Sequence, residues 1–93
     1  MRILLKKTGC PKCLNYLGVI QKINFRLPVD KRIIIIDTTA YEEYGVAFNP
    51  LILHLKWEGT PTLFLDGNKV VGMTSPSYVK GYLEAYLEDE LLW

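Results

Sequence analysis

Two short runs of apolar residues in the first half of the chain predict buried β-strands. The segment Arg2 to Lys6 holds three consecutive apolar residues, and an unbroken apolar run is typical of a strand covered on both faces. The segment Arg32 to Asp37 contains four isoleucines in a row, and such β-branched residues favour strands. It therefore predicts a second strand, central in its sheet and covered on both faces.

The segment between these strands has the spacing of an amphipathic helix. Apolar residues recur every three positions from Pro11 onward, and they predict the buried side of the helix: Leu14, Leu17, Ile20 and Ile23. Pro28 cannot continue a helix, so the predicted end lies near Asn24 or Phe25. A strand, a helix and a second buried strand form a βαβ unit, whose crossover is right-handed in nearly all proteins.

The residues from Thr38 to Gly59 leave two interpretations open. Thr39 and Glu42 have the spacing of a helix capping box, and Asn49-Pro50 is a typical helix start. We therefore expect two short helices here. A strand through Leu51 to Leu55 is the alternative, because periodicity does not distinguish the two in so short an apolar run.

The last third of the chain predicts a β-hairpin followed by a helix. Two runs rich in strand-forming residues, Thr62 to Leu65 and Lys69 to Gly72, flank the turn Asp66-Gly67-Asn68. Ser75-Pro76 then predicts the start of a helix, with a capping residue followed by proline. The apolar positions expected to line that helix are Val79, Tyr82, Leu83, Tyr86, Leu87 and Leu91.

The predicted elements follow the order β-α-β-α-β-β-α within one domain, residues 1–93. The first two strands are connected through a helix and are expected to be parallel, whereas the last two form an antiparallel hairpin. We therefore predict an α/β fold built on a four-stranded mixed sheet, with helices on both faces.

Composition and charge narrow the classes of function. The chain has 11 Lys and Arg residues against 10 Asp and Glu residues, a formal net charge of +1, and both signs are mixed along it. This balance provides no broad basic surface, so we expect neither a nucleic acid nor a membrane as partner. The apolar run at the start is too short for a signal peptide or a membrane span, and we expect a cytoplasmic monomer.

The strongest candidate for chemistry is Cys10-Pro11-Lys12-Cys13, which contains both cysteines and opens the first predicted helix. Two cysteines separated by two residues on a first helical turn are close enough to form a disulfide. Pro11 suits the first helical position, where its missing N–H costs nothing. The free N–H groups of that helix end and the charges of Lys7 and Lys12 should lower the pKa of Cys10. The pattern predicts thiol–disulfide chemistry, with Cys10 as nucleophile and Cys13 as resolving cysteine.

This order of elements, with a CxxC pair directly after the first strand, resembles the thioredoxin superfamily, and its small glutaredoxin-like branch most closely. Lys7, three residues before the first cysteine, and the proline inside the CxxC motif are similar to glutaredoxins. The stretch Thr60-Pro61-Thr62-Leu63-Phe64, followed by Asp66-Gly67, resembles the second signature of the superfamily. The resemblance covers essentially the whole chain and implies a thioredoxin-like fold.

The resemblance also implies roles for residues outside the CxxC motif. It implies that Pro61 faces the cysteines and that the peptide bond before it is cis. The cis bond leaves the backbone of Thr60 free to pair with an extended substrate. At the start of the last helix, where glutaredoxins carry acidic residues, this chain has Thr74 and Ser75, and we expect their hydroxyl or N–H groups to contact substrate.

The activity that the resemblance implies is a redox-active disulfide that reduces client proteins and serves electron transport. Electrons would come from glutathione or from a reductase of the thioredoxin type, with no tightly bound cofactor. The stretch Gly72 to Pro76 lacks the acidic residues with which glutaredoxins hold glutathione, so the electron donor stays open.

Two alternatives to redox catalysis remain for the same cysteines. Zinc needs four ligands, and His54 is the only other soft candidate, so two chains would have to share the site. Some relatives of glutaredoxins bridge two chains through an iron–sulfur cluster. The other alternative is a binding module whose cysteines do not turn over. For the single chain we expect no metal site.

Overall fold

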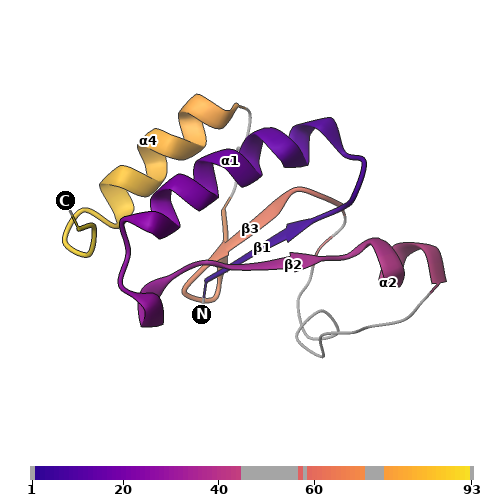
Figure 1. Ribbon diagram of the computed structural model, residues 1–93, viewed down its shortest axis with the longest axis horizontal. Coiled ribbons are helices and arrows are strands. Elements are labelled where there is room, and N and C mark those ends of the chain that lie inside the picture. The colour runs from indigo at the N-terminus through magenta and orange to yellow at the C-terminus, as the bar shows by residue number, and fades with distance from the viewer. Residues whose placement is uncertain (1, 45–56, 58, 71–74, 93) are drawn as a thin grey trace.

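The centre of the molecule is a four-stranded mixed sheet in the order β2-β1-β3-β4 (Figure 1). It is seen in a computed structural model that describes residues 2–44, 57, 59–70 and 75–92. β1 runs parallel to β2 and antiparallel to β3, and β3 and β4 form an antiparallel hairpin. The predicted four-stranded mixed sheet is therefore confirmed. The strands are β1 (Arg2–Lys6), β2 (Ile34–Asp37), β3 (Thr62–Leu65) and β4 (Asn68–Lys69).

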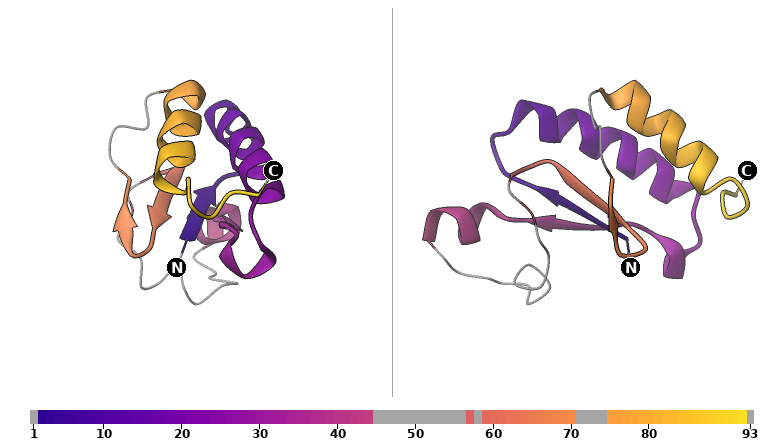
Figure 2. Two further views of the ribbon diagram at one scale, coloured as in Figure 1. Left: turned by 90° about the vertical axis from the view of Figure 1, so that its left-hand side faces the viewer. Right: turned by 180° about the vertical axis from the view of Figure 1, so that it is seen from behind.

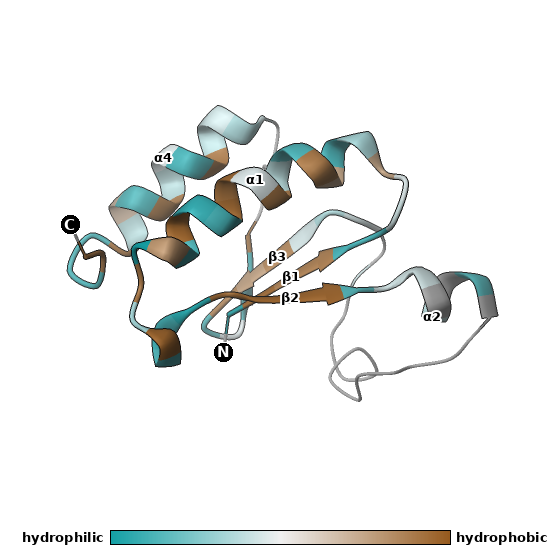
Figure 3. Cartoon of the chain, in the orientation of Figure 1, coloured by the Kyte–Doolittle hydropathy of each residue, from teal (hydrophilic) through white to brown (hydrophobic). Residues whose placement is uncertain are grey.

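Helices α1 (Pro11–Phe25) and α4 (Pro76–Tyr86) pack against each other on one face of the sheet (Figure 1, Figure 2). The main hydrophobic core lies between these helices and the strands, where Leu4, Ile20 and Leu83 are fully buried. Figure 3 shows hydrophobic strands beneath helices that alternate between hydrophobic and hydrophilic residues. Removal of this apolar surface from water is the main force that holds the two layers together.

The opposite face of the sheet carries a second, smaller hydrophobic cluster. Its buried members are Ile3, Leu5, Ile36 and Phe64. Because side chains alternate along a strand, β1 supplies residues to both cores. Helix α2 (Thr39–Tyr44) lies beyond the end of β2 and contributes Tyr41 to this cluster, where Trp57 also packs (Figure 1). In the described part of the chain, α1 and α4 cover one face of the sheet, and of the opposite face only the small cluster with Tyr41 of α2 is seen, so the predicted cover of both faces is confirmed for one face.

Strand β2 lies at the edge of the described sheet, so the prediction of a central strand over Arg32–Asp37 is wrong. The strand begins at Ile34, whose side chain is 46% exposed, and a short 3-10 helix, η1 (Val29–Lys31), precedes it. A run of β-branched residues favours a strand, but the strands that pair with it decide its place in the sheet. The prediction for β1, which lies between β2 and β3 and is buried throughout its centre, is confirmed.

The buried side of α1 agrees with the prediction at Ile20 and Ile23 and in part at Leu17, but not at Leu14. Leu14 is 66% exposed, and the buried residues of the helix are Cys13, Tyr16, Ile20 and Ile23. A helix has 3.6 residues per turn, so its buried positions follow spacings of three and four rather than a constant three. The first turn of α1 therefore buries Cys13 and leaves Leu14 exposed.

The last helix is shorter than predicted and buries fewer aromatic residues. It ends at Tyr86, and Leu87 and Leu91 are buried in the segment that follows. Tyr82 and Tyr86 are 38% and 45% exposed and stack on each other with ring centroids 6.1 Å apart. Tyrosine tolerates such a boundary position because its ring packs while its hydroxyl stays in water. None of the helices in the described ranges combines the length and the apolar character that crossing a membrane requires.

A two-residue turn at Asp66 and Gly67 joins β3 to β4, with φ angles of +51° and +90°. Asp-Gly is favoured in such turns because both positions need positive φ. The predicted second strand began at Lys69, whereas β4 already begins at Asn68. The end of that predicted strand, the predicted helix start at Asn49-Pro50 and its alternative strand at 51–55 lie outside the described residues.

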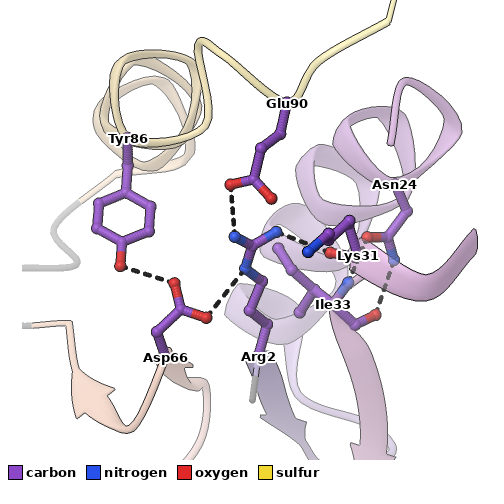
Figure 4. A network of polar contacts seen from close by, with 7 residues as sticks. All are labelled: Arg2, Asn24, Lys31, Ile33, Asp66, Tyr86 and Glu90. Atoms are coloured by element: carbon purple, nitrogen blue, oxygen red, sulfur yellow. Dashed lines mark hydrogen bonds and ion pairs between the residues drawn. The ribbon is translucent and has the colours of Figure 1, made fainter. Parts of the chain in front are cut away.

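Arg2 joins several parts of the chain at the end of the sheet opposite the CxxC motif (Figure 4). Its guanidinium, which is 10% exposed with the rest of the side chain, donates hydrogen bonds to Asp66 at 3.3 Å and Glu90 at 2.6 Å. It also donates to the carbonyl of Lys31 at 2.9 Å. The Tyr86 hydroxyl donates to the other oxygen of Asp66 at 2.8 Å. The hydrogen bond from Tyr86, and then those from Arg2, lower the pKa of Asp66 below its usual value.

Candidate functional site

Cys10 and Cys13 form a disulfide across the first turn of α1, with their Cα atoms 5.2 Å apart. Cys10 is the N-cap residue of the helix, and Pro11 occupies the first turn as predicted. The Sγ atom of Cys10 accepts a hydrogen bond from the backbone N–H of Cys13 at 3.1 Å. The sulfur therefore takes the place of a capping oxygen at the free N–H groups of the helix, where a thiolate is stabilised.

The two cysteines differ in their access to solvent. Cys13 is 1% exposed, whereas Cys10 is partly exposed. Tyr16, one turn further along the same side of α1, is a buried residue of the main core. A molecule that approaches the start of α1 therefore meets the Cys10 sulfur first.

The segment before Cys10 is tied to the end of β2 by four polar residues, Lys6, Thr8, Asp37 and Thr39, which we call the Asp37 cluster. The Asp37 carboxylate accepts hydrogen bonds from the Thr8 hydroxyl at 2.7 Å and from the Thr39 N–H at 2.8 Å. The same carboxylate lies 3.2 Å from the Lys6 ammonium. The Thr39 hydroxyl in turn accepts a hydrogen bond from the Thr8 N–H at 2.8 Å.

These contacts determine the charge of Asp37. Burial raises the pKa of its carboxyl group, but the hydrogen bonds that it accepts outweigh this effect, those from Thr39 most of all. The pKa of Asp37 therefore lies well below its usual range, and the group is a carboxylate at neutral pH.

No motif in the sequence points to the Asp37 cluster. A weaker signal was present, because Asp37 is the last residue of a strand that is predicted to run parallel to the first one. The carboxyl ends of parallel strands meet at the same edge of a sheet, so polar residues that follow them become neighbours. Thr8 and Asp37 are in contact for this reason, although 29 positions separate them.

Lys7 and Lys12 are predicted to lower the pKa of Cys10 through their positive charges. Lys7 lies in the turn before α1, and its carbonyl accepts a hydrogen bond from the Cys10 N–H at 3.4 Å. Lys12 is exposed on the first turn of the helix. Lys12 belongs to the CxxC motif and Lys7 lies three residues before it, and their effect on the pKa of Cys10 stays a prediction.

The start of β3, which Thr60 and Pro61 directly precede, lies at the same end of the sheet as the start of α1 (Figure 1). Strand β3 starts at Thr62, which pairs with Leu5 near the end of β1, so the residues before it reach that end of the sheet. The Thr60–Pro61 peptide bond is cis, as the resemblance to thioredoxins implies. Docking of a substrate on this backbone stays a prediction.

Ser75 begins α4, and its hydroxyl oxygen accepts a hydrogen bond from the N–H of Tyr78 at 3.2 Å. The predicted capping role of Ser75 is therefore confirmed. Thr74 lies outside the described residues, and contact of Thr74 and Ser75 with substrate stays a prediction.

Within the described ranges, no three His, Cys, Asp or Glu side chains come together as a group that could hold a metal ion. His54 lies outside these ranges. The chain matches no model of a known protein family and no curated protein. Fold and site together define a small α/β protein with a CxxC disulfide at the start of a helix.

Proposed function

We propose that the protein is a thiol–disulfide oxidoreductase in which Cys10 is the nucleophile and Cys13 the resolving cysteine. One observation carries the proposal: a partly exposed cysteine caps a helix and pairs with a buried cysteine three residues further on. An external disulfide can reach the sulfur of Cys10. The buried sulfur of Cys13 can reach only the sulfur of Cys10. A CxxC pair in a βαβ unit is typical of redox proteins.

The reaction consists of two exchanges. The Cys10 thiolate attacks one sulfur of a client disulfide and forms a new S–S bond, and the other client sulfur leaves as a thiolate that takes up a proton. Cys13 then gives up its proton and attacks the Cys10 sulfur, which releases the second client thiol. The client gains two electrons, and the CxxC pair loses two. The 5.2 Å between the two Cα atoms suits the closing disulfide without rearrangement of the helix.

The class that we propose is the glutaredoxin-like branch of the thioredoxin superfamily. The βαβ unit, the antiparallel hairpin and the CxxC pair directly after β1 support this class. In it, Lys7 and Lys12 lower the pKa of Cys10, and Thr60 and Pro61 dock the backbone of the substrate.

The proposed partners are client proteins that carry accessible disulfides. Glutathione or a reductase of the thioredoxin type returns electrons to the CxxC pair, and Thr74 and Ser75 contact the small thiol where glutathione is the donor. The protein needs no tightly bound cofactor for this chemistry, because the two thiols carry both electrons.

A redox titration in glutathione buffers tests the proposal. Alkylation of free thiols followed by measurement of the intact mass gives the oxidised fraction at each potential. We expect a midpoint between about −270 and −180 mV, the range of exchange-active dithiols. An adduct of one glutathione on Cys10 would identify glutathione as donor, and its absence would favour a reductase.

Three results would decide against this function. A midpoint below about −300 mV belongs to structural disulfides and would contradict the proposal. Thiols that react only after a chelator is added would support the metal alternative. Glutathione adducts that form equally well in Cys10→Ser would show that Cys10 is not the reactive cysteine.

A further inference from the structure

The Asp37 cluster connects the segment that carries Cys10 to the start of α2. β1 and β2 run parallel with Lys6 opposite Asp37, so the segments that follow the two strands leave the sheet side by side (Figure 1). The N–H and the hydroxyl of Thr38, a fully buried residue, both donate to the Lys6 carbonyl, at 2.8 and 3.1 Å. The two segments are therefore joined through side chains as well as through the backbone.

Thr8 is the member of the cluster nearest to the reactive cysteine. It stands two residues before Cys10; its hydroxyl donates to Asp37 at the end of β2, and its N–H donates to Thr39 at the start of α2. The intervening Gly9 has a φ of +82°, a left-handed conformation that glycine adopts readily. Glycine adds freedom to the chain rather than restraint, so the turn before α1 is held by the anchoring of Thr8 together with the hydrogen bond from the Cys10 N–H to the Lys7 carbonyl.

A firm turn matters because the Cys10 sulfur has to stay at the end of the helix. There it accepts the N–H of Cys13 at 3.1 Å. The favourable effect of a helix end on a negative charge is confined to the first turn. When the turn loosens, the sulfur leaves this position for part of the time, and the thiolate fraction falls.

We propose that Asp37 is a positioning residue for Cys10 and acts through the hydroxyl of Thr8. The carboxylate holds Thr8, Thr8 fixes the turn, and the turn presents the sulfur to the free N–H groups of α1. The Lys6 ammonium lies 3.2 Å from the Asp37 carboxylate and offsets its negative charge, which would otherwise oppose formation of the Cys10 thiolate. The inference rests on the proposed function in one respect, since it takes Cys10 as the reacting thiol.

Thr8→Val is the decisive variant, because it removes the hydroxyl and changes neither the size nor the charge of the side chain. Alkylation of Cys10 by iodoacetamide in the reduced protein, followed by peptide mass, reports the thiolate. At pH 7 we expect the alkylation rate to fall about two- to fivefold, because a helix end typically stabilises a nearby negative charge by a factor of this size. The pH at which the rate reaches half its maximum should rise. Thr8→Ser keeps the hydroxyl and should react like the wild type.

Asp37→Asn provides a second test. The amide oxygen still accepts the N–H of Thr39, but the NH₂ group can only donate to the hydroxyl of Thr8, so a neutral hydrogen bond replaces the stronger one that the carboxylate accepts. Because this variant also frees the charge of Lys6, and because salt screens the helix end as well, its rate is compared with that of Thr8→Val at the same salt concentration, both at low salt and in about 1 M NaCl. We expect slowing in the same direction as in Thr8→Val, but no larger. Asp30→Asn removes an exposed carboxylate in η1, at the other end of the sheet, and should match the wild type.

Equal alkylation rates and pH profiles in the wild type and Thr8→Val would overturn the inference. This holds even where the unfolding temperature falls, because the cluster would then only stabilise the fold. Should Asp37→Asn fail to fold, Thr8→Val decides alone. Failure of the proposed function would look different: wild-type Cys10 would exchange with no disulfide, while the comparison of alkylation rates would remain valid.

Discussion

In the proposed mechanism, Cys10 and Cys13 have different roles because the first turn of α1 leaves Cys10 partly exposed and buries Cys13. The sulfur of Cys10 caps α1, and the side chain of Cys13 is buried in the same turn. A buried thiol is protected from bulky partners, yet it lies next to the sulfur that it has to release. The order of the two exchanges follows from this difference.

Replacement of Cys13 by Ser should therefore trap the mixed disulfide between Cys10 and its client. Without a resolving thiol, the intermediate has no internal route to completion. We expect a covalent complex with a small disulfide-bonded protein, visible by intact mass and lost on addition of reductant. Cys10→Ser is the matched control and should form none. A complex that forms equally well in Cys10→Ser would identify Cys13 as the nucleophile and refute the assignment.

At the scale of the element, local sequence signals determine where α1 begins, whereas packing determines which of its sides is buried. Local signals define its start, because Pro11 belongs in a first turn and Cys10 serves as the cap. The apolar residues recur often enough to predict a helix but not to define its buried side. Packing against the sheet and α4 selects the side with Ile20 and leaves Leu14 in water.

This orientation predicts different costs for two substitutions on the same helix. Ile20→Ala should lower the free energy of unfolding by about 2–5 kcal/mol, because it leaves a cavity in a fully buried site. Leu14→Ala should change it by about 0.5 kcal/mol or less, since the side chain is mostly exposed. Urea denaturation of both variants, with the cysteines kept in the same redox state, measures the difference. Similar losses in the two variants would contradict this orientation of α1.

At the scale of the whole molecule, polar clusters secure both ends of the central strand β1. The Asp37 cluster holds the end that leads to Cys10, and the contacts of Arg2 hold the other end (Figure 4). Through Arg2, the start of β1 is bound to the hairpin turn at Asp66 and to the segment after α4 at Glu90. These contacts connect the sheet to the segment that follows the last helix, at the end of the sheet that lies away from the CxxC motif.

The lowered pKa of Asp66 predicts how stability depends on pH. A pKa below the unfolded value means that the folded state favours the carboxylate, so the contribution is complete above about pH 5 and is lost as the pH falls through the folded pKa. Asp66→Asn removes this carboxylate, and asparagine tolerates the positive φ of the turn. Since the side chain is 44% exposed, we expect a loss of about 1 kcal/mol or less at pH 7.

Denaturation of the wild type and Asp66→Asn across a pH series provides the measurement. The difference in unfolding free energy should stay constant from about pH 7 to 5 and shrink below about pH 4. Asp30→Asn, on an exposed carboxylate, is the control and should follow the wild type. A difference between wild type and Asp66→Asn that persists unchanged to about pH 3 would show that the ion pair is not its source.

The sequence alone determined those features that depend on neighbouring residues. The apolar run of β1, the Asp66-Gly67 turn and the two helix starts marked by Pro11 and Pro76 are local signals, and each is found where it was predicted. The CxxC motif is local too, because one helical turn suffices to bring its sulfurs together.

Only the tertiary structure decided what depends on contacts between distant segments. Pairing of strands placed Ile34 at an edge, and packing of α1 on the sheet exposed Leu14. The contact between Thr8 and Asp37 exists because two parallel strands end together, and no nearby residue announces it. Local preferences are short-ranged and weak, whereas burial of apolar surface and pairing of polar groups act on the assembled chain, so these features are determined only when the chain folds.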